Sequence, residues 1–421
     1  MASRSRLVQG RSIPDRWTVS PLHALLEEEF AGAWGVEPAA KPENVKVLRS
    51  TNLDDDGHLD YTSGALRLFA SRDLHEKQLK TGDLLLESSG GGPGKPVGRV
   101  AFFCDPHDGW RYSVSNFFRT LRPGPAVVPK YLAYCLSHVY RQPSIWQLQQ
   151  QTTGIINLKY SDYLDQDVLV PPLGEQKRIV EALDAVGESI RSAGRHLAKM
   201  EAMGRGLLAG VFSAGSGERV GWTSFRVGEL LNGRPKNGYS PKAGNGFSGT
   251  YMLGLGCLTV NGFSATQLKY APGDDPAVGR AVLTDGDLLI GRANTRDLVG
   301  MIGRYADIGY PCIYPDLMMR LRVGDKVLPE FLELLLRSDD CRRQIQARAS
   351  GTSESMVKIS ADIVLNLTVR VPSIAEQQRI LDMNNSLSVA VNDARLEIAK
   401  LRRFSDGMMD SLLTGRTRIE V

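Results

Sequence analysis

Cysteine is scarce in this sequence, and its spacing suits neither a disulfide framework nor a metal site. The chain has 421 residues and five cysteines, and no two of them form a Cys-x-x-Cys pair. The six histidines are scattered, with no pair at metal-ligand spacing. We therefore predict reduced thiols in a cytoplasmic protein that binds no metal.

Long hydrophobic runs are also missing. No segment approaches the roughly 18 consecutive apolar residues of a membrane span, and the basic N-terminus is followed by no apolar stretch typical of a signal peptide. The net charge is only +4, so a nucleic-acid surface would have to be a local patch. The hydrophobic content of 42% and charged content of 23% suit a globular protein of about two or three domains.

Recognisable catalytic motifs are lacking as well. The run from Gly90 to Lys95 has a passing likeness to a phosphate loop, but Ser89 replaces its first glycine and Pro96 stands where a magnesium-binding hydroxyl is needed. There is no nucleophile elbow, no Asn-Pro-Pro-aromatic motif and no glycine-rich cofactor fingerprint after a strand. The acidic run Asp54–Asp56 is interpreted as a solvated turn before Gly57. We predict no catalytic residue and no cofactor in this chain.

What the chain does have is a long helical pattern that occurs twice. One copy opens at Pro171-Pro172-Leu173-Gly174-Glu175-Gln176 and the other at Val371-Pro372-Ser373-Ile374-Ala375-Glu376-Gln377. Apolar residues then recur at alternating spacings of four and three, which is the seam of a coiled coil. Helices of about 35–40 residues would be roughly 55–60 Å long, so we expect spacer helices whose seams pack on each other. The predicted packing residues are Ile179, Leu183, Val186, Ile190, Leu197, Met200, Leu207, Ile380, Leu387, Val391, Ile398, Leu401 and Met408, with the polar Asn384 at one seam position.

The segments before the two helices also match each other. Trp17-Thr18 corresponds to Trp222-Thr223, Gly57 to Gly262, and the Gly-Asp-Leu-Leu turn at 82–85 to the one at 286–289. A period of about 200 residues is too long for a solenoid and indicates a duplicated domain. The pattern predicts strands after each Gly-Asp turn, amphipathic helices over 129–140 and 329–343, and short closing strands at 168–170 and 367–371.

The loops of the two copies differ while the frameworks match, as expected when loops carry specificity. Their side chains suit DNA, because Arg and Lys pair with guanine edges or phosphates, Asn and Gln with adenine, and hydroxyls with phosphates. Polar residues also fill ordinary solvent loops, so composition alone leaves both interpretations open. The candidate DNA-binding residues are Lys95, Gln151, Thr152, Thr153, Asn157, Lys159, Tyr160, Lys236, Asn237, Tyr239, Ser240, Arg292, Asn294, Arg296, Ser353 and Lys358.

The two helix openings resemble those of type I restriction–modification specificity (S) subunits. The helix ends, Gly206–Val211 and Ser411–Ile419, and the Gly-Asp-Leu-Leu turns resemble that family too. The resemblance implies an α+β chain with two mixed α/β target recognition domains, separated by two long antiparallel helices that form a coiled coil. The implied division is a flexible arm at 1–16, recognition domain 1 at 17–171, spacer helix 1 at 172–212, recognition domain 2 at 213–371, spacer helix 2 at 372–415 and a tail at 416–421.

The resemblance further implies a non-catalytic DNA-addressing role in antiphage defence. Each recognition domain would read one half of a split, asymmetric double-stranded site, and the helices would dock two methyltransferase subunits and, through them, the restriction (motor–nuclease) subunits. S-adenosylmethionine, ATP and magnesium would bind to those partners, and the assembled complex would methylate adenine N6 and cut DNA with ATP.

Three other interpretations stay open at this point. One is a self-contained DNA methyltransferase or nuclease, against which the missing motifs argue. Another is a protein–protein scaffold with two domains, a coiled coil and no DNA role. The last is a specificity component of a differently organised restriction system, which the sequence does not distinguish from the first.

Overall fold

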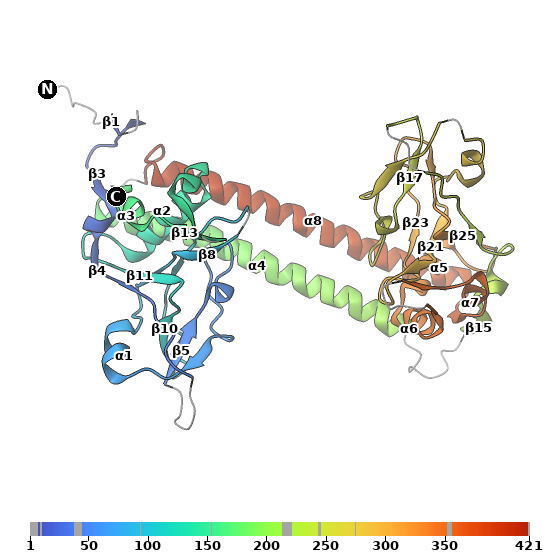
Figure 1. The fold of residues 1–421 in the computed structure, drawn as a ribbon, viewed down its shortest axis with the longest axis horizontal. Helices are drawn as coiled ribbons and strands as arrows, with labels where there is room; N and C mark the ends of the chain where they lie inside the picture. The colour runs from blue at the N-terminus through green and yellow to red at the C-terminus, as the bar shows by residue number, and fades with distance from the viewer. Residues whose placement is uncertain are drawn as a thin grey trace. The chain divides into compact units, whose positions relative to one another are not determined.

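The computed structural model divides into two compact units (Figure 1), which are described separately. Unit 1 comprises Met1–Gly194 and Glu397–Val421, and unit 2 comprises Arg195–Leu396. Each unit thus contains one globular part and one half of each long helix, whereas the division implied by the resemblance treats the helices as segments of their own. The structure describes residues 7–8, 11–37, 44–92, 94–152, 154–212, 221–242, 246–273, 275–351 and 356–419.

The central sheet of unit 1 is antiparallel and has the strand order β4-β11-β7-β9. Its strands are Leu26–Ala31, Phe118–Pro123, Leu84–Glu87 and Val100–Phe102. A second sheet has the order β10-β5-β6, with Arg111–Val114 parallel to Val45–Leu48 and Ala65–Arg67 antiparallel to it. The helix α2 (Pro129–Arg141) lies against β9 and contributes Tyr131, Leu132 and Leu136 to the core.

Shorter elements complete unit 1. The strands β14 (Asp167–Val170) and β3 (Thr18–Pro21) pair just before the first long helix. A three-stranded ribbon joins β12, β13 and β8, which are Gln149–Thr152, Ile155–Leu158 and Ser89–Gly91. The helices α1 and α3 are Ser71–Lys77 and Tyr160–Leu164. Within the predicted N-terminal arm, β1 (Leu7–Val8) and β2 (Arg11–Ser12) form a short antiparallel pair.

Unit 2 repeats this topology, so the predicted duplication is confirmed. Its central sheet has the order β16-β25-β21-β23, with strands Lys236–Asn237, Met318–Leu321, Leu288–Gly291 and Ile302–Arg304. Its second sheet, β20-β17-β24, is built from Leu268–Tyr270, Tyr251–Leu253 and Cys312–Ile313. The remaining strand pairs are β15-β27 (Thr223–Arg226, Thr368–Val371), β22-β26 (Ala293–Asn294, Val357–Lys358) and β18-β19 (Leu258–Thr259, Gly262–Phe263).

The predicted length of one helix in unit 2 is wrong. The range 329–343 was expected to be continuous, but the structure has α5 (Pro329–Arg337) and α6 (Asp339–Arg348). Ser338 has extended backbone angles, and its hydroxyl accepts a hydrogen bond from the Cys341 amide, as an N-cap does. The chain therefore restarts its helix at Asp339. A short helix, α7 (Ala361–Leu365), follows later.

The Gly-Asp turns have the same physical role in both units. Gly82 and Gly286 have φ angles of +103° and +85°, which favour glycine. The carboxylate of Asp83 accepts a hydrogen bond from the Lys80 amide at 2.7 Å, and Asp287 accepts one from Thr284 at 2.9 Å. Arg122 in β11 binds Asp83 through two nitrogens, and Arg320 in β25 binds Asp287. The turn thus leads directly into a strand whose side chains are buried on both faces.

The repeated Glu-Gln pair at each helix opening joins the helix to its globular part. Gln176 is fully buried; its Oε1 accepts from the Val128 amide at 2.7 Å, and its Nε2 donates to the Pro171 carbonyl at 2.8 Å. Gln377 makes the equivalent bonds, to Leu328 at 2.8 Å and to Pro372 at 2.9 Å. These side chains satisfy main-chain groups at the start of α2 or α5, which explains why the motif occurs in both copies.

The neighbouring glutamates each bind a tryptophan. Trp17 donates its indole N–H to Glu175 at 3.0 Å, and Trp222 donates to Glu376 at 3.2 Å. In unit 1 the Arg418 guanidinium also binds Glu175, at 2.9 and 3.1 Å. The C-terminal segment is therefore attached to the first turn of the first long helix.

The two long helices, α4 (Leu173–Phe212) and α8 (Ile374–Leu413), pack against each other and run antiparallel within each unit. In unit 1, Ile179 and Leu183 share a core with Met409 and Leu413, and in unit 2 the Arg395 guanidinium binds Glu201 at 2.6 Å. The predicted fold class is therefore confirmed. All thirteen predicted packing residues are buried or half-buried, and Asn384 is half-buried.

Candidate nucleic-acid interface

In unit 1 the candidate residues gather on the ribbon β12-β13-β8. In the ribbon's register, Asn157 is opposite Gln150 and Ser89, while Ile156 is opposite Gln151 and Gly91. Residues directly opposite each other share a face of the ribbon, and Ile156 is buried. Asn157, Gln150 and Ser89 therefore share the other face. The exposed Gln151 lies on the same face as Ile156, so Gln150 belongs with Asn157 in the amide-rich row.

Several polar side chains of this ribbon have structural partners. The Ser89 hydroxyl donates to Asn157 Oδ1 at 2.5 Å, which orients the amide. Lys159 donates to the Gln147 carbonyl at 3.0 Å, and Lys95 pairs with Asp55 at 3.3 Å. Lys95 is thus attached to the acidic turn and not to the Asn157 row.

The Tyr160 ring contacts an arginine side chain, which the sequence pattern did not indicate. The Arg119 guanidinium stacks on the Tyr160 ring, 3.8 Å from its centroid. The two residues are 41 positions apart, in β11 and α3, so only the folded chain brings them together. Thr153 lies outside the described residues, as does the Thr152 side chain.

Unit 2 has the same main-chain frame at the equivalent place. In unit 1, the Ser88 amide donates to the Phe117 carbonyl at 2.8 Å and the Leu158 amide to the Ser88 carbonyl at 2.9 Å. In unit 2, the Arg292 amide donates to Leu317 at 2.7 Å and the Ile359 amide to Arg292 at 2.9 Å. The ribbon β22-β26 is therefore the structural counterpart of β8-β13, and Arg292 stands where unit 1 has Ser88.

The side chains on the unit 2 frame are more cationic. Lys358 is exposed on β26, directly opposite Ala293, and Arg292 is half-buried beside it in sequence. Asn294 accepts a hydrogen bond on Oδ1 from the Thr295 amide at 2.8 Å. Arg296 instead donates to the carbonyls of Gln346 and Ala349, which makes it a brace for the end of α6. Ser353 lies outside the described residues.

The segment 236–240 lies next to this ribbon. The Gly238 amide donates to Met318, the residue after Leu317, to which Arg292 is bonded. Lys236 and Asn237 are exposed there on β16. Position 238 needs glycine, because a Cβ would lie 2.0 Å from the Tyr314 carbonyl oxygen. These main-chain bonds to the adjacent residues Leu317 and Met318 place β16 close to the ribbon β22-β26. The five candidates on these segments are called the unit 2 stretch: Lys236, Asn237, Arg292, Asn294 and Lys358.

Two further candidates beside this stretch are held by carboxylates. The Tyr239 hydroxyl donates to Asp275 at 2.7 Å, and this hydrogen bond raises the Tyr239 pKa above its ordinary value. Ser240 and Asp316 exchange hydrogen bonds, the Ser240 hydroxyl donating to the carboxylate and accepting from the Asp316 amide. These hydrogen bonds hold the loop in its conformation, and they occupy the polar atoms of both side chains.

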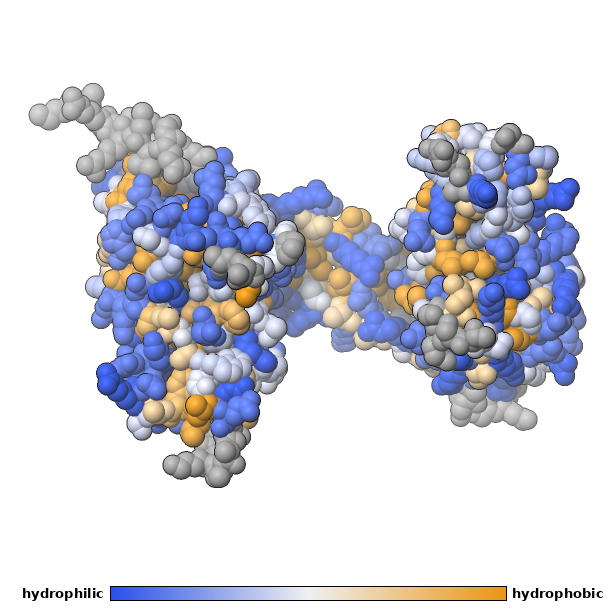
Figure 2. Space-filling view, in the orientation of Figure 1, coloured by the Kyte–Doolittle hydropathy of each residue, from blue (hydrophilic) through white to orange (hydrophobic). Residues whose placement is uncertain are grey.

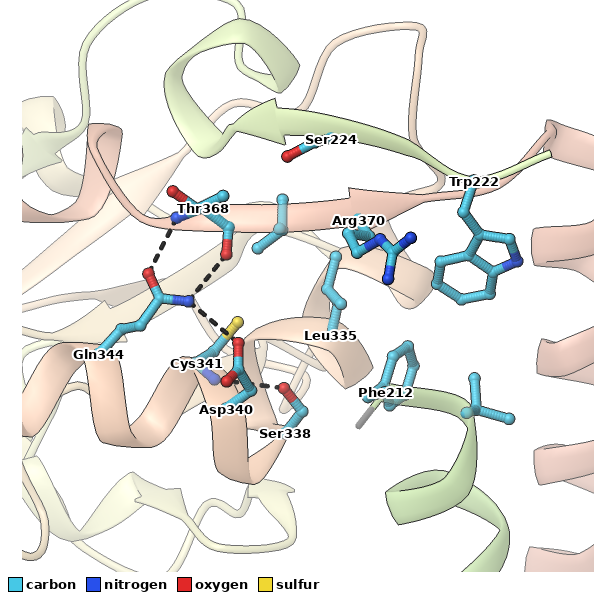
Figure 3. Close-up of a pocket in the computed structure, with 12 residues that line it drawn as sticks. Phe212, Trp222, Ser224, Leu335, Ser338, Asp340, Cys341, Gln344, Thr368 and Arg370 are labelled. Atoms are coloured by element: carbon cyan, nitrogen blue, oxygen red, sulfur yellow. Dashed lines mark hydrogen bonds between the residues drawn. The ribbon is translucent and has the colours of Figure 1, made fainter. Parts of the chain in front are cut away.

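A surface pocket of about 190 Å³ lies elsewhere in unit 2, between the end of α4, α6 and β27 (Figure 3). Phe212 and Trp222 form its aromatic side, and Asp340 and Gln344 its polar side. Gln344 donates to Asp340 at 3.1 Å and to the Thr368 carbonyl at 2.8 Å, while accepting from the Thr368 amide at 3.0 Å. Its polar groups therefore hold α6 to β27, and the volume is below that of typical small-molecule sites.

The visible surface is largely hydrophilic, with scattered apolar residues (Figure 2). Within the described ranges, no three His, Cys, Asp or Glu side chains gather as metal ligands would. No helix in the described part of the chain has the length and apolar character needed to cross a membrane.

Comparison with known proteins shows what this architecture is similar to. Residues 42–202 match the family model for the type I restriction modification DNA specificity domain. This segment is a type I restriction–modification specificity domain. The resemblance inferred from the helix openings is thereby confirmed.

Named relatives of the specificity domain extend the match along the chain. The type I restriction enzyme EcoKI specificity subunit of Escherichia coli K12 is 23% identical, over 88% of this chain and 81% of that protein. The MjaVIII specificity subunit of Methanocaldococcus jannaschii is 23% identical, over 69% of this chain and 70% of that protein. These relatives are named as specificity subunits of their enzymes.

Solved structures share the fold. A chain from a structural study of complex assembly and conformational transition of the type I R-M system gives a TM-score of 0.61 at 18% identity, covering 97% of this chain and 100% of that one. The S subunit of a type I restriction-modification system from M. genitalium gives 0.53 at 14% identity, covering 97% and 98%.

Proposed function

We propose that this chain is the non-catalytic specificity subunit of a type I restriction–modification complex, and that each recognition domain reads one half of a split, asymmetric DNA site. The observation that carries the proposal is one hydrogen-bonded frame, present in both units, that bears different side chains. Ser88 and Arg292 make the same two main-chain bonds, yet one neighbours an amide-rich ribbon and the other a cationic ribbon. A repeated frame with different side chains suits two readers of unlike sequences.

The chemistry of the two surfaces differs in a way that predicts different bases. The unit 1 row has the amides of Gln150 and Asn157, which suit adenine, and the Arg119 cation lies on the neighbouring β11. The unit 2 stretch has Lys236, Arg292 and Lys358, which suit guanine or phosphates. We therefore propose an adenine-containing half-site for unit 1 and a guanine-containing half-site for unit 2.

The long helices would dock two methyltransferase subunits, and through them the restriction subunits. In this proposal S-adenosylmethionine, ATP and magnesium bind to those partners, so that adenine N6 methylation and ATP-dependent cleavage are activities of the complex. This chain determines which DNA sequence the complex binds.

The test is a base-resolution map of N6-methyladenine in cells that carry the cognate methyltransferase subunit, with and without this chain. We expect a split motif that appears only with the chain, and exchange of residues 17–170 for those of a relative should change one half of it. A complex that forms and binds S-adenosylmethionine, but shows no chain-dependent methylation, would refute the proposal and leave the scaffold interpretation.

A matched pair of variants tests the proposed surface in unit 2. Lys358→Ala should weaken DNA binding by about 1–3 kcal/mol if the lysine reads a base. If the lysine binds a phosphate, the slope of log affinity against log salt concentration should become shallower by about one. Lys269→Ala removes an equally exposed lysine from β20 in the same unit and should leave binding unchanged. Equal effects of the two variants would show that the ribbon is not the interface.

A further inference from the structure

The acidic turn Asp54–Asp56 is exposed, as its sequence predicts, and it also makes ion pairs that the sequence does not reveal. It is closed by Asp54, whose Oδ1 accepts from the amides of Asp56 and His58 at 2.9 and 2.8 Å, and by Gly57 with a φ of +86°. The sequence predicts a turn whose carboxylates face solvent, and Asp54, Asp55 and Asp56 are exposed. In addition, Asp56 contacts α8 and the neighbouring His58 contacts α4, both within unit 1.

Asp56 makes the attachment to α8. Its carboxylate lies 3.2 Å from Arg402 on α8 and 3.5 Å from Arg141 at the end of α2. Arg141 in turn pairs with Asp406, one helical turn beyond Arg402. Asp56 and Arg141 of the globular part thus form a series of ion pairs with Arg402 and Asp406 of α8.

His58 makes the attachment to α4. Its Nε2 lies 3.3 Å from an Arg191 guanidinium nitrogen, and its Nδ1 lies 3.2 Å from the Asp54 carboxylate. A guanidinium only donates, so Nε2 accepts and the ring proton is on Nδ1, where it faces the carboxylate. Arg191 is also held by Glu188 on its own helix, at 2.9 Å.

The turn is also anchored to the central sheet. Asp55 pairs with Arg99, which is buried and binds both oxygens of the buried Glu87 at 2.7 and 2.8 Å. Arg99 further donates to the Leu53 carbonyl at 2.8 Å, immediately before the turn. The sheet, the turn and both long helices of unit 1 are thus joined by one connected set of polar contacts.

The second copy lacks the carboxylate for this attachment. Asn261 stands where the first copy has Asp56, whereas Arg337, the last residue of α5, takes the place of Arg141, the last residue of α2. There the equivalent turn is held by Arg337 of α5, which donates to the Val260 carbonyl at 3.0 Å. The attachment is therefore an addition of the first copy and not a requirement of the fold.

We propose that Asp56, with Arg141 and Arg402, is a positioning set that fixes the angle of recognition domain 1 on the spacer helices and so sets the length of DNA allowed between the half-sites. This inference rests on the proposed function. Surface ion pairs are weak and screened by salt, so this set adds a modest restraint to the angle that the shared core of the long helices and the globular part also holds.

The experiment selects DNA from a library in which both half-sites are constant and the number of base pairs between them varies, using the complex with the methyltransferase subunit. The variants are Asp56→Arg, Arg402→Asp and the double charge reversal. Asp167→Arg is the matched control, because it makes the same charge change in recognition domain 1, outside the long helices, at an exposed aspartate with no ion pair among the described residues.

We expect Asp56→Arg to lower the preference for the wild-type spacing over its neighbours by roughly fivefold, the factor that corresponds to one exposed ion pair. The half-site sequences should not change, since the reading surfaces are untouched. The double reversal should restore part of the preference, because Arg141 still lies beside position 56, and the control should resemble wild type.

Two results overturn the inference and differ from failure of the proposed function. Unchanged spacing preference in Asp56→Arg shows that packing alone fixes the angle, and no recovery in the double reversal shows that the effect is not the ion pair. If the wild-type complex selects no split site at all, the proposed function itself fails and the positioning role fails with it.

Discussion

Gln377 offers the sharpest test of how the helix openings are held. The Gln377→Ala substitution removes three hydrogen bonds, from the Leu328 amide at 2.8 Å and to the carbonyls of Pro372 and Lys326 at 2.9 and 3.2 Å. The side chain is fully buried, so its own polar atoms are shielded from water in the folded state. A buried polar group left without a partner costs about 1–3 kcal/mol, and we expect unit 2 to lose about 2–5 kcal/mol.

The adjacent Gln378 is the control. It is exposed, and its side chain donates to Asp382 one turn later, at 2.9 Å, with no other side-chain hydrogen bond among the described residues. Alanine favours helix at such a position, so Gln378→Ala should change stability by less than about 0.5 kcal/mol.

Hydrogen exchange followed by mass spectrometry separates the two units, because peptides from α5 report on unit 2 alone. A loss of 2 kcal/mol corresponds to exchange about 30-fold faster in α5 and β27. Equal exchange in the two variants would refute the reasoning, since it would mean that the Glu-Gln motif does not satisfy the main chain at the start of α5.

Three further predictions concern buried charge and burial of thiols. Arg122→Ala should destabilise unit 1 by about 3–5 kcal/mol in urea unfolding, because it leaves the Asp83 carboxylate, 1% exposed, without its cation; an effect below 1 kcal/mol would contradict this. Burial alone would raise the pKa of Glu175, but hydrogen bonds from Arg418 and Trp17 lower it below the ordinary 4.5. Glu175 therefore stabilises the fold above about pH 4.5, and this contribution is lost as pH falls through the folded pKa. In Arg418→Ala, the melting temperature should fall less steeply with decreasing pH than in the wild type. Burial raises the pKa of Cys135 and Cys312 to about 12, so iodoacetamide at pH 8 should modify the exposed Cys104 and spare these two until denaturant is added; early labelling of Cys135 would show that α2 opens.

The long helices could be predicted because their signal is local and periodic. Residues such as Leu183 and Val391 repeat at a spacing that only a helix with one apolar seam explains, and the seam residues are buried or half-buried. The duplication was visible for the same reason, since equal motifs at equal separations need no knowledge of the fold. The break at Ser338 was missed because the apolar pattern continues across it and the N-cap hydrogen bond depends on a single hydroxyl.

The roles of polar loop residues could not be predicted, because their partners are distant in sequence. Arg296 was grouped with the DNA-binding candidates, yet it donates to carbonyls 50 and 53 residues later. Gln149 satisfies both main-chain groups of Val97 from across the ribbon, while its neighbour Gln150 shares a face with Asn157. Composition identifies which side chains have suitable chemistry, and only tertiary contacts decide which of them remain available.

The division of the chain into units has a consequence for its synthesis. Unit 2 is one continuous stretch, 195–396, whereas unit 1 needs 397–421 as well. The core of unit 1 includes Met409, Leu412 and Leu413, and Glu175 of unit 1 pairs with Arg418. Domains generally fold as they leave the ribosome, N-terminal part first, but here the first domain to emerge must wait for the last 25 residues. Premature termination near the end of the message should therefore spare the second domain and leave the first one incomplete.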